Sequence, residues 1–119
     1  MLNYTSAKIL LCVTPTDMRK SFDGLAALAR EHLQSDPLSG TWFVFRNKRA
    51  DKLKLLYWDK DGYAIWQKRL EAGRFEMPKI PVDAAGVSIS SSDLALILGG
   101  IDLSSARRRK RFELERQAG

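Results

Sequence analysis

Residues 42–66, WFVFRNKRADKLKLLYWDKDGYAIW, constrain the fold more than any other part of the chain. Large apolar side chains alternate there with charged ones, and alternation with a period of two is typical of β-strands. NKRAD (47–51) is typical of a hairpin loop, and DKDG (59–62) of a tight turn. The pattern predicts an antiparallel three-stranded meander over residues 41–67.

The alternation also predicts which side chains share a face of the meander. We expect one face to form the core, and its members are Phe43, Phe45, Leu53, Leu55 and Tyr57. The opposite face then mixes tryptophans with cations, namely Trp42, Trp58, Arg46, Lys52 and Lys54. The face taken by Trp66 depends on the register, which the sequence leaves open.

The residues before the meander predict one strand and one helix. Ile9 to Val13 is a continuous apolar run, as in a buried strand. Apolar residues then recur at spacings of three and four, which predicts one long amphipathic helix over residues 17–34. Thr16 or Asp17 is the expected N-cap of this helix.

The residues after the meander predict a short C-terminal helix. A proline-containing connection is followed by Ser90, a candidate N-cap, with Asp93 three residues later and Gly99 as the expected end. The predicted fold is therefore α+β. It consists of an antiparallel β-meander with an N-terminal strand, one long helix packed on the sheet and a short C-terminal helix.

Length and composition predict a single domain. We expect residues 1–103 of the 119-residue chain to form it, followed by a basic tail over residues 104–119. The single cysteine, Cys12, excludes an intrachain disulfide and gives no sign of an oxidising compartment. No apolar stretch approaches the roughly 20 residues that span a bilayer, so we expect a cytoplasmic protein without membrane contact.

The sequence contains no recognisable pattern of catalytic residues. The only histidine, His32, has no cluster of cysteines or carboxylates around it, so neither a metal site nor a histidine-activated nucleophile is indicated. Phosphate-binding glycine loops are absent as well. We predict no enzyme activity, no cofactor and no metal.

The charge balance instead favours a polyanionic partner. Twenty Lys and Arg residues face fourteen Asp and Glu residues, which gives a net charge of +6. Nucleic acid is the first candidate and an anionic membrane the second, and a merely solubilising basic surface is the alternative.

Two basic regions could contact such a partner. On the meander, Arg46, Lys52 and Lys54 could neutralise phosphates and Trp58 could stack on bases, with Lys48 and Arg49 at the hairpin tip. The alternative is that the tryptophans are covered and the lysine stems lie over them. The second region is the densest block of charge in the chain, Arg107, Arg108, Arg109, Lys110 and Arg111, which is either a solvated arm or a second phosphate contact.

Three long segments carry a resemblance to a known family: PTDMRKSFDGLAAL (15–28), residues 36–75 and LALILGGID (94–102). They resemble the TnpB-type accessory proteins of the insertion-sequence 66 family, the small second-frame products of these elements. The resemblance covers residues 7–103. It implies a bacterial mobile-element protein that works beside the transposase of the same element, and it carries over no catalytic residue.

The DMRK segment within this resemblance suggests a further phosphate contact. In the predicted helix, Arg19 and Lys20 lie in the first turn, next to free backbone N–H groups that favour anions. The alternative is that Arg19 pairs with Asp23, four residues later.

The function that we predict is a non-enzymatic accessory factor of DNA transposition that binds DNA, the transposase or both. The alternatives are a protein–protein adaptor without direct DNA binding and a metal-dependent nuclease with an unrecognised site.

Overall fold

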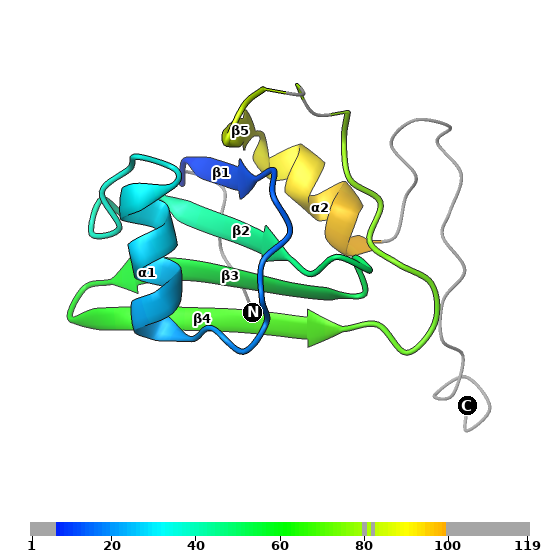
Figure 1. Cartoon of the computed structure of the whole chain (residues 1–119), viewed down its shortest axis with the longest axis horizontal. Coiled ribbons are helices and arrows are strands. Elements are labelled where there is room, and N and C mark those ends of the chain that lie inside the picture. The colour runs from blue at the N-terminus through cyan, green and yellow to red at the C-terminus, as the bar shows by residue number, and fades with distance from the viewer. Residues whose placement is uncertain (1–6, 80, 82, 100–119) are drawn as a thin grey trace.

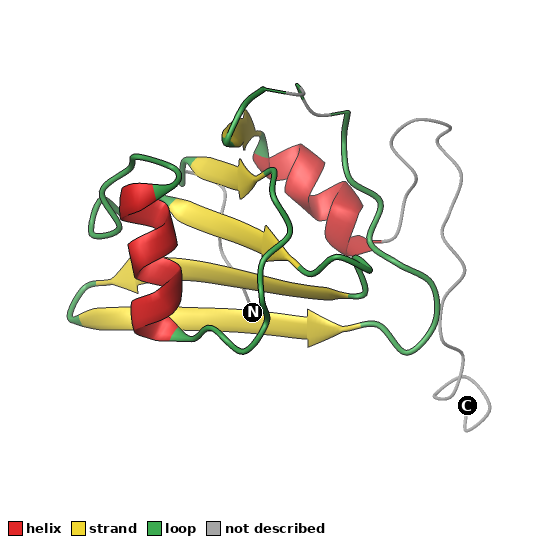
Figure 2. Ribbon diagram, in the orientation of Figure 1, coloured by secondary structure: helices red, strands yellow, loops and turns green. Residues whose placement is uncertain are grey.

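A five-stranded mixed sheet with two short helices forms the fold in the computed structural model, which describes residues 7–79, 81 and 83–99 (Figures 1 and 2). The elements follow in the order β1 (Ile9–Cys12), α1 (Phe22–Glu31), β2 (Trp42–Arg46), β3 (Lys52–Asp59), β4 (Gly62–Arg69), β5 (Gly86–Ile89) and α2 (Ser91–Gly99). The strand order across the sheet is β4-β3-β2-β1-β5. Among the described residues, no helix is long and apolar enough to cross a membrane.

The predicted meander is confirmed as β2, β3 and β4, which pair antiparallel. The predicted N-terminal strand is confirmed as β1, but it pairs parallel to β2, with α1 as the crossover. The connection after the meander contains a strand that the sequence did not predict, β5, which pairs antiparallel to β1. The sheet is therefore mixed, and the expectation of a purely antiparallel sheet is wrong.

The two faces of the sheet hold separate cores, and the predicted single core face is wrong. Phe43 pairs with Leu56 and Phe45 with Lys54, and directly paired residues share a face. Phe43, Phe45 and Leu56 therefore pack against α1, on the front of the sheet in Figure 1. Leu53 and Leu55 belong to the other core, together with α2 and with Trp42, Val44 and Phe75.

Helix α1 is shorter than the predicted helix, which was expected over residues 17–34. It begins at Phe22 after Ser21, so Thr16 and Asp17 are not its N-cap. The predicted start was too early because Met18 fits the apolar spacing of the helix. Met18 packs against the same core as α1 but does so from the loop before it. At the other end, Gln34 has a left-handed φ of 53°, and the N–H of Ser35 donates to the carbonyl of Ala29 at 2.9 Å.

The short C-terminal helix is confirmed as α2, and so is its cap. The N–H of Asp93 donates to Oγ of Ser90 at 3.0 Å, and the N–H of Ser90 donates to the Asp93 carboxylate at 3.2 Å. This reciprocal pair is a capping box with Asp in the place of Glu. Leu94 and Ile97 are the helix residues buried against the sheet.

Candidate nucleic-acid interface

Residues 13–20 form a strap that connects β1 to α1 and crosses in front of β2, β3 and β4 (Figure 1). Its first half is held by β2. The N–H of Thr16 donates to the carbonyl of Arg46 at 2.7 Å, and the Arg46 guanidinium donates to the carbonyl of Val13 at 2.8 Å. The strap is therefore attached to the sheet through the backbone and a side chain of the same residue.

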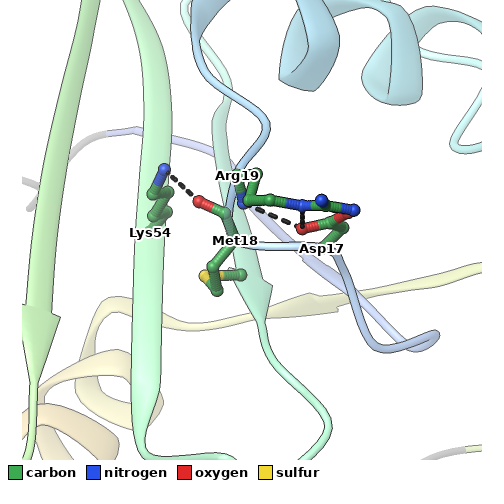
Figure 3. Close-up of polar contacts among 4 residues, drawn as sticks. All are labelled: Asp17, Met18, Arg19 and Lys54. Carbon is green, nitrogen blue, oxygen red and sulfur yellow. Dashed lines mark hydrogen bonds and ion pairs between the residues drawn. The ribbon is translucent and has the colours of Figure 1, made fainter.

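The second half of the strap is held by Lys54. Nζ of this residue donates to the carbonyls of Met18 and Lys20, each at 2.8 Å, and Figure 3 shows the first of these bonds. Lys54 points to this side because it pairs with Phe45, which faces α1. A lysine on a half-covered sheet face thus satisfies two loop carbonyls that would otherwise need water.

Arg19 is fixed by Asp17 within the strap (Figure 3). The Asp17 carboxylate accepts a bond from the backbone N–H of Arg19 at 2.9 Å and from its guanidinium at 2.7 Å. These bonds, the guanidinium bond first, lower the pKa of Asp17 to about 2. The partner is Asp17 and not Asp23, because residues 17–20 form a turn that precedes α1. The expectation that Arg19 and Lys20 occupy the first turn of the helix is therefore wrong.

The hairpin tip beside the strap is also held by its own side chains. The side-chain Nδ2 of Asn47 donates to the Asp51 carboxylate at 2.6 Å, and the backbone N–H of Lys52 donates to the side-chain Oδ1 of Asn47 at 3.0 Å. The bond from Asn47, more than the nearby Arg49 and Lys52, holds the pKa of Asp51 below its ordinary value. The loop therefore presents Lys48 and Arg49 from a defined conformation.

Two adjacent hollows lie between the strap, the hairpin tip and the ends of β3 and β4. Their volumes are about 380 Å³ and 440 Å³, and they share Met18 and Lys52. Seven cations and one carboxylate, Asp17, line them. We call this surface the basic groove, and its cations are Arg19, Lys48, Arg49, Lys52, Lys54, Lys68 and Arg69.

Five of the residues predicted to bind nucleic acid meet in the basic groove, namely Arg19, Lys48, Arg49, Lys52 and Lys54. Lys68 and Arg69 were missed. Arg69 pairs directly with Lys52 across β3 and β4, so the alternation that singled out Lys52 could have identified Arg69 once the register was known.

The other predicted residues lie apart from the groove lining. The stem of Lys20 lies against Gly24 of α1, where an added Cβ would come within 3.2 Å of it. The Arg46 guanidinium is occupied by the strap. The predicted tail contacts, residues 107–111, lie outside the described residues.

The tryptophans build the structure and do not line the groove. Trp42 is buried and stacks on Tyr57 with ring centroids 4.6 Å apart, and Trp66 packs against the same core. Trp58 is half-buried and makes a T-shaped contact with Tyr63, with ring centroids 5.1 Å apart. It lies six strand positions from Lys52, which is about 20 Å along β3. In the described part of the chain, no aromatic side chain lines either hollow.

No group of three or more potential metal ligands occurs among the described residues. The buried Cys12 also lacks the surroundings of a reactive thiol, because burial raises the pKa of its Sγ. The described cations form a surface suited to binding anions.

Comparison with known proteins identifies a family whose model matches most of the chain. Residues 7–108 match the family model described as IS66 Orf2 like protein. Two proteins of Sinorhizobium fredii strain NGR234 are similar to the chain, and both are described as uncharacterized. Protein y4jC is 36% identical over 102 residues, which cover 86% of each chain. Protein y4hO is 35% identical over 97 residues, which cover 82% of this chain and 83% of its own. No solved structure matches the chain.

Proposed function

Because the chain belongs to the family of IS66 Orf2-like proteins, we propose that it is an accessory factor of DNA transposition that binds the DNA backbone through the basic groove. The observation that carries the proposal is the lining of the groove, which contains seven cations from three separate segments and one carboxylate. That carboxylate, Asp17, is already paired with Arg19.

The chemistry of the groove favours phosphates over bases. Lysine and arginine side chains neutralise phosphates and release condensed counterions, which gives affinity without sequence readout. Recognition of unpaired bases relies on aromatic side chains for stacking, and the tryptophans lie elsewhere in the fold. The groove therefore suits the backbone of duplex DNA better than unpaired bases.

The chain does not perform the strand transfer itself in this proposal. Family membership supports a role beside the transposase of the same element, and the absence of a metal-ligand cluster among the described residues gives no support to a nuclease. The groove would hold or position element DNA while the transposase supplies the catalytic groups.

Fluorescence anisotropy with a labelled duplex tests the proposal. Lys48→Gln combined with Lys52→Gln removes two groove cations, and the matched control, Arg30→Gln combined with Lys60→Gln, removes two exposed cations outside it. Both variants have the same net charge. We expect the groove variant to bind about tenfold more weakly and to reduce the slope of log K against log salt by about 2, since each phosphate contact contributes about 0.9. We expect the control to retain the parent slope.

Two outcomes contradict the proposal. If both double variants lose affinity equally, net charge and not the groove determines binding. If neither variant changes affinity or slope, the DNA hypothesis is wrong and the protein–protein adaptor replaces it.

A further inference from the structure

Strand β4 is an edge strand without the usual protection of an edge. It is eight residues long and pairs with β3 without interruption from Lys52–Arg69 to Asp59–Gly62, so it contains no bulge. It contains no proline, and its first half is the apolar run Tyr63 to Trp66. Native sheets commonly shorten, bulge or break such edges, because the free N–H and C=O groups are a template for another strand. The opposite edge, β5, is only four residues long.

The backbone groups that β4 offers can be identified from the register. Lys60 and Asp61 form a two-residue loop, so Asp59 and Gly62 are the hydrogen-bonded pair that closes the hairpin. Bonding alternates along the strand. The residues whose backbone groups point away from β3 are therefore Tyr63, Ile65, Gln67 and Arg69. In the described part of the chain, the backbone hydrogen bonds outside the regular elements involve none of them.

The two ends of β4 carry opposite charges. Asp59, Lys60 and Asp61 lie at its beginning, around the turn, and carry a net charge of −1, whereas Lys68 and Arg69 at its end carry +2. An antiparallel copy of the same strand would place each acidic end beside a basic end. Opposite charges on directly paired residues stabilise strand pairing, and like charges oppose it, so the edge is complementary to itself and not to a parallel copy.

We propose that two copies of this chain associate through β4, in antiparallel pairing around Ile65, and so join their sheets into one. In this register Ile65 pairs with itself and Tyr63 with Gln67, and the loop residue Asp61 lies beside Arg69 of the second copy. Arg69 exchanges its exposed bond to Glu71, 2.8 Å long, for the carboxylate of the second copy. The contact is isologous, as in most homodimers.

This pairing has a consequence for the basic groove. The two-fold axis is perpendicular to the sheet, so both grooves face the same side. The two Arg69 residues lie eight strand positions apart, about 27 Å along the paired strands. A dimer thus offers two grooves to one duplex. The dimer itself does not depend on DNA binding, so it is measured without DNA.

Sedimentation equilibrium of charge-reversed variants tests the register. Asp61→Arg alone and Arg69→Asp alone each create two like-charge pairs at the interface, and we expect each to raise the dimer dissociation constant about tenfold. The double variant restores both pairs in swapped orientation, and we expect it to return to within about threefold of the parent. If the double variant is as weak as the single ones, this register is wrong.

A proline substitution tests the edge itself. Gln67 is exposed and directs its N–H away from β3, so Gln67→Pro removes no bond within the monomer but blocks pairing with a second copy. We expect a folded monomer by circular dichroism and sedimentation, and an unchanged dimer in the matched control Gln67→Thr. The proposal is overturned if the parent protein is monomeric at about 100 µM, roughly 100-fold above a micromolar dissociation constant. It is equally overturned if Gln67→Pro dimerises as well as the parent.

Discussion

Lys54 is expected to stabilise the fold, whereas its neighbour Lys52 is expected to act on the ligand. The two lysines lie two positions apart on β3 and project from the same face of the sheet. Nζ of Lys54 is bound to two carbonyls of the strap, and Lys52 is exposed in the basic groove. Replacing each by methionine keeps the apolar stem and removes only the ammonium group.

The expected cost of Lys54→Met follows from the two hydrogen bonds that it removes. A bond with a charged partner contributes about 1.5–3 kcal/mol, and the bond to Lys20 contributes less than this because it is exposed to water. We expect a loss of about 2–3 kcal/mol in the free energy of unfolding and a fall of about 10 °C in Tm. Lys52→Met removes no bond among the described residues, so we expect a change within about 0.5 kcal/mol.

Urea unfolding followed by tryptophan fluorescence measures both changes, because Trp42 lies in the core. Amide hydrogen exchange adds a local measurement. The N–H of Thr16, bound to the Arg46 carbonyl, should exchange faster in Lys54→Met than in the parent, since the strap is then held at one half only. Equal stability of the two methionine variants would refute this role of Lys54, and so would unchanged exchange at Thr16.

Three further predictions concern single residues. The Asp17 carboxylate is stabilised in its charged form, so its contribution to the stability of the fold is complete above about pH 4 and is lost as the pH falls through about 2. An NMR titration of Asp17 should show a midpoint at about pH 2, and Arg19→Gln should raise this midpoint towards about 4. Ala50 has a φ of 58°, so Ala50→Gly should increase stability by about 0.5 kcal/mol in urea unfolding, and a decrease would count against backbone strain at this position. Trp42→Ala should cost about 3–5 kcal/mol in the same assay and Trp58→Ala about 1–2 kcal/mol, because only the first ring is buried; equal costs would contradict this difference.

Local sequence patterns were sufficient for most strands, turns and caps. The meander follows from alternation and from the turn residues of NKRAD and DKDG, and the cap of α2 follows from Ser90 and Asp93, since each signal lies within a few residues. The extent of α1 was not predictable in this way, because Met18 continues the apolar spacing from outside the helix. Strand β5 was missed because GVSI is short and follows a proline-containing connection.

The candidate site could be predicted in part, residue by residue. Charge and exposure indicated Lys48, Arg49 and Lys52, which depend only on the hairpin and its alternation. The same reasoning treated Lys54 as equivalent to Lys52, although Lys54 binds strap carbonyls 34 and 36 residues earlier in the chain. A contact at that separation leaves no local signal in the sequence.

The sequence by itself thus determined that residues 42–66 form paired strands, that the surface is basic and that the chain resembles a transposition accessory family. Only the tertiary structure decided which face each strand residue occupies. Both faces of the sheet are covered, one by α1 and the other by α2, so the hydrophobic pattern of β2 and β3 fits either register. The observed register pairs Phe45 with Lys54 and Lys52 with Arg69, and it thereby places Lys52, Lys54 and Arg69 on the same side of the sheet as the strap.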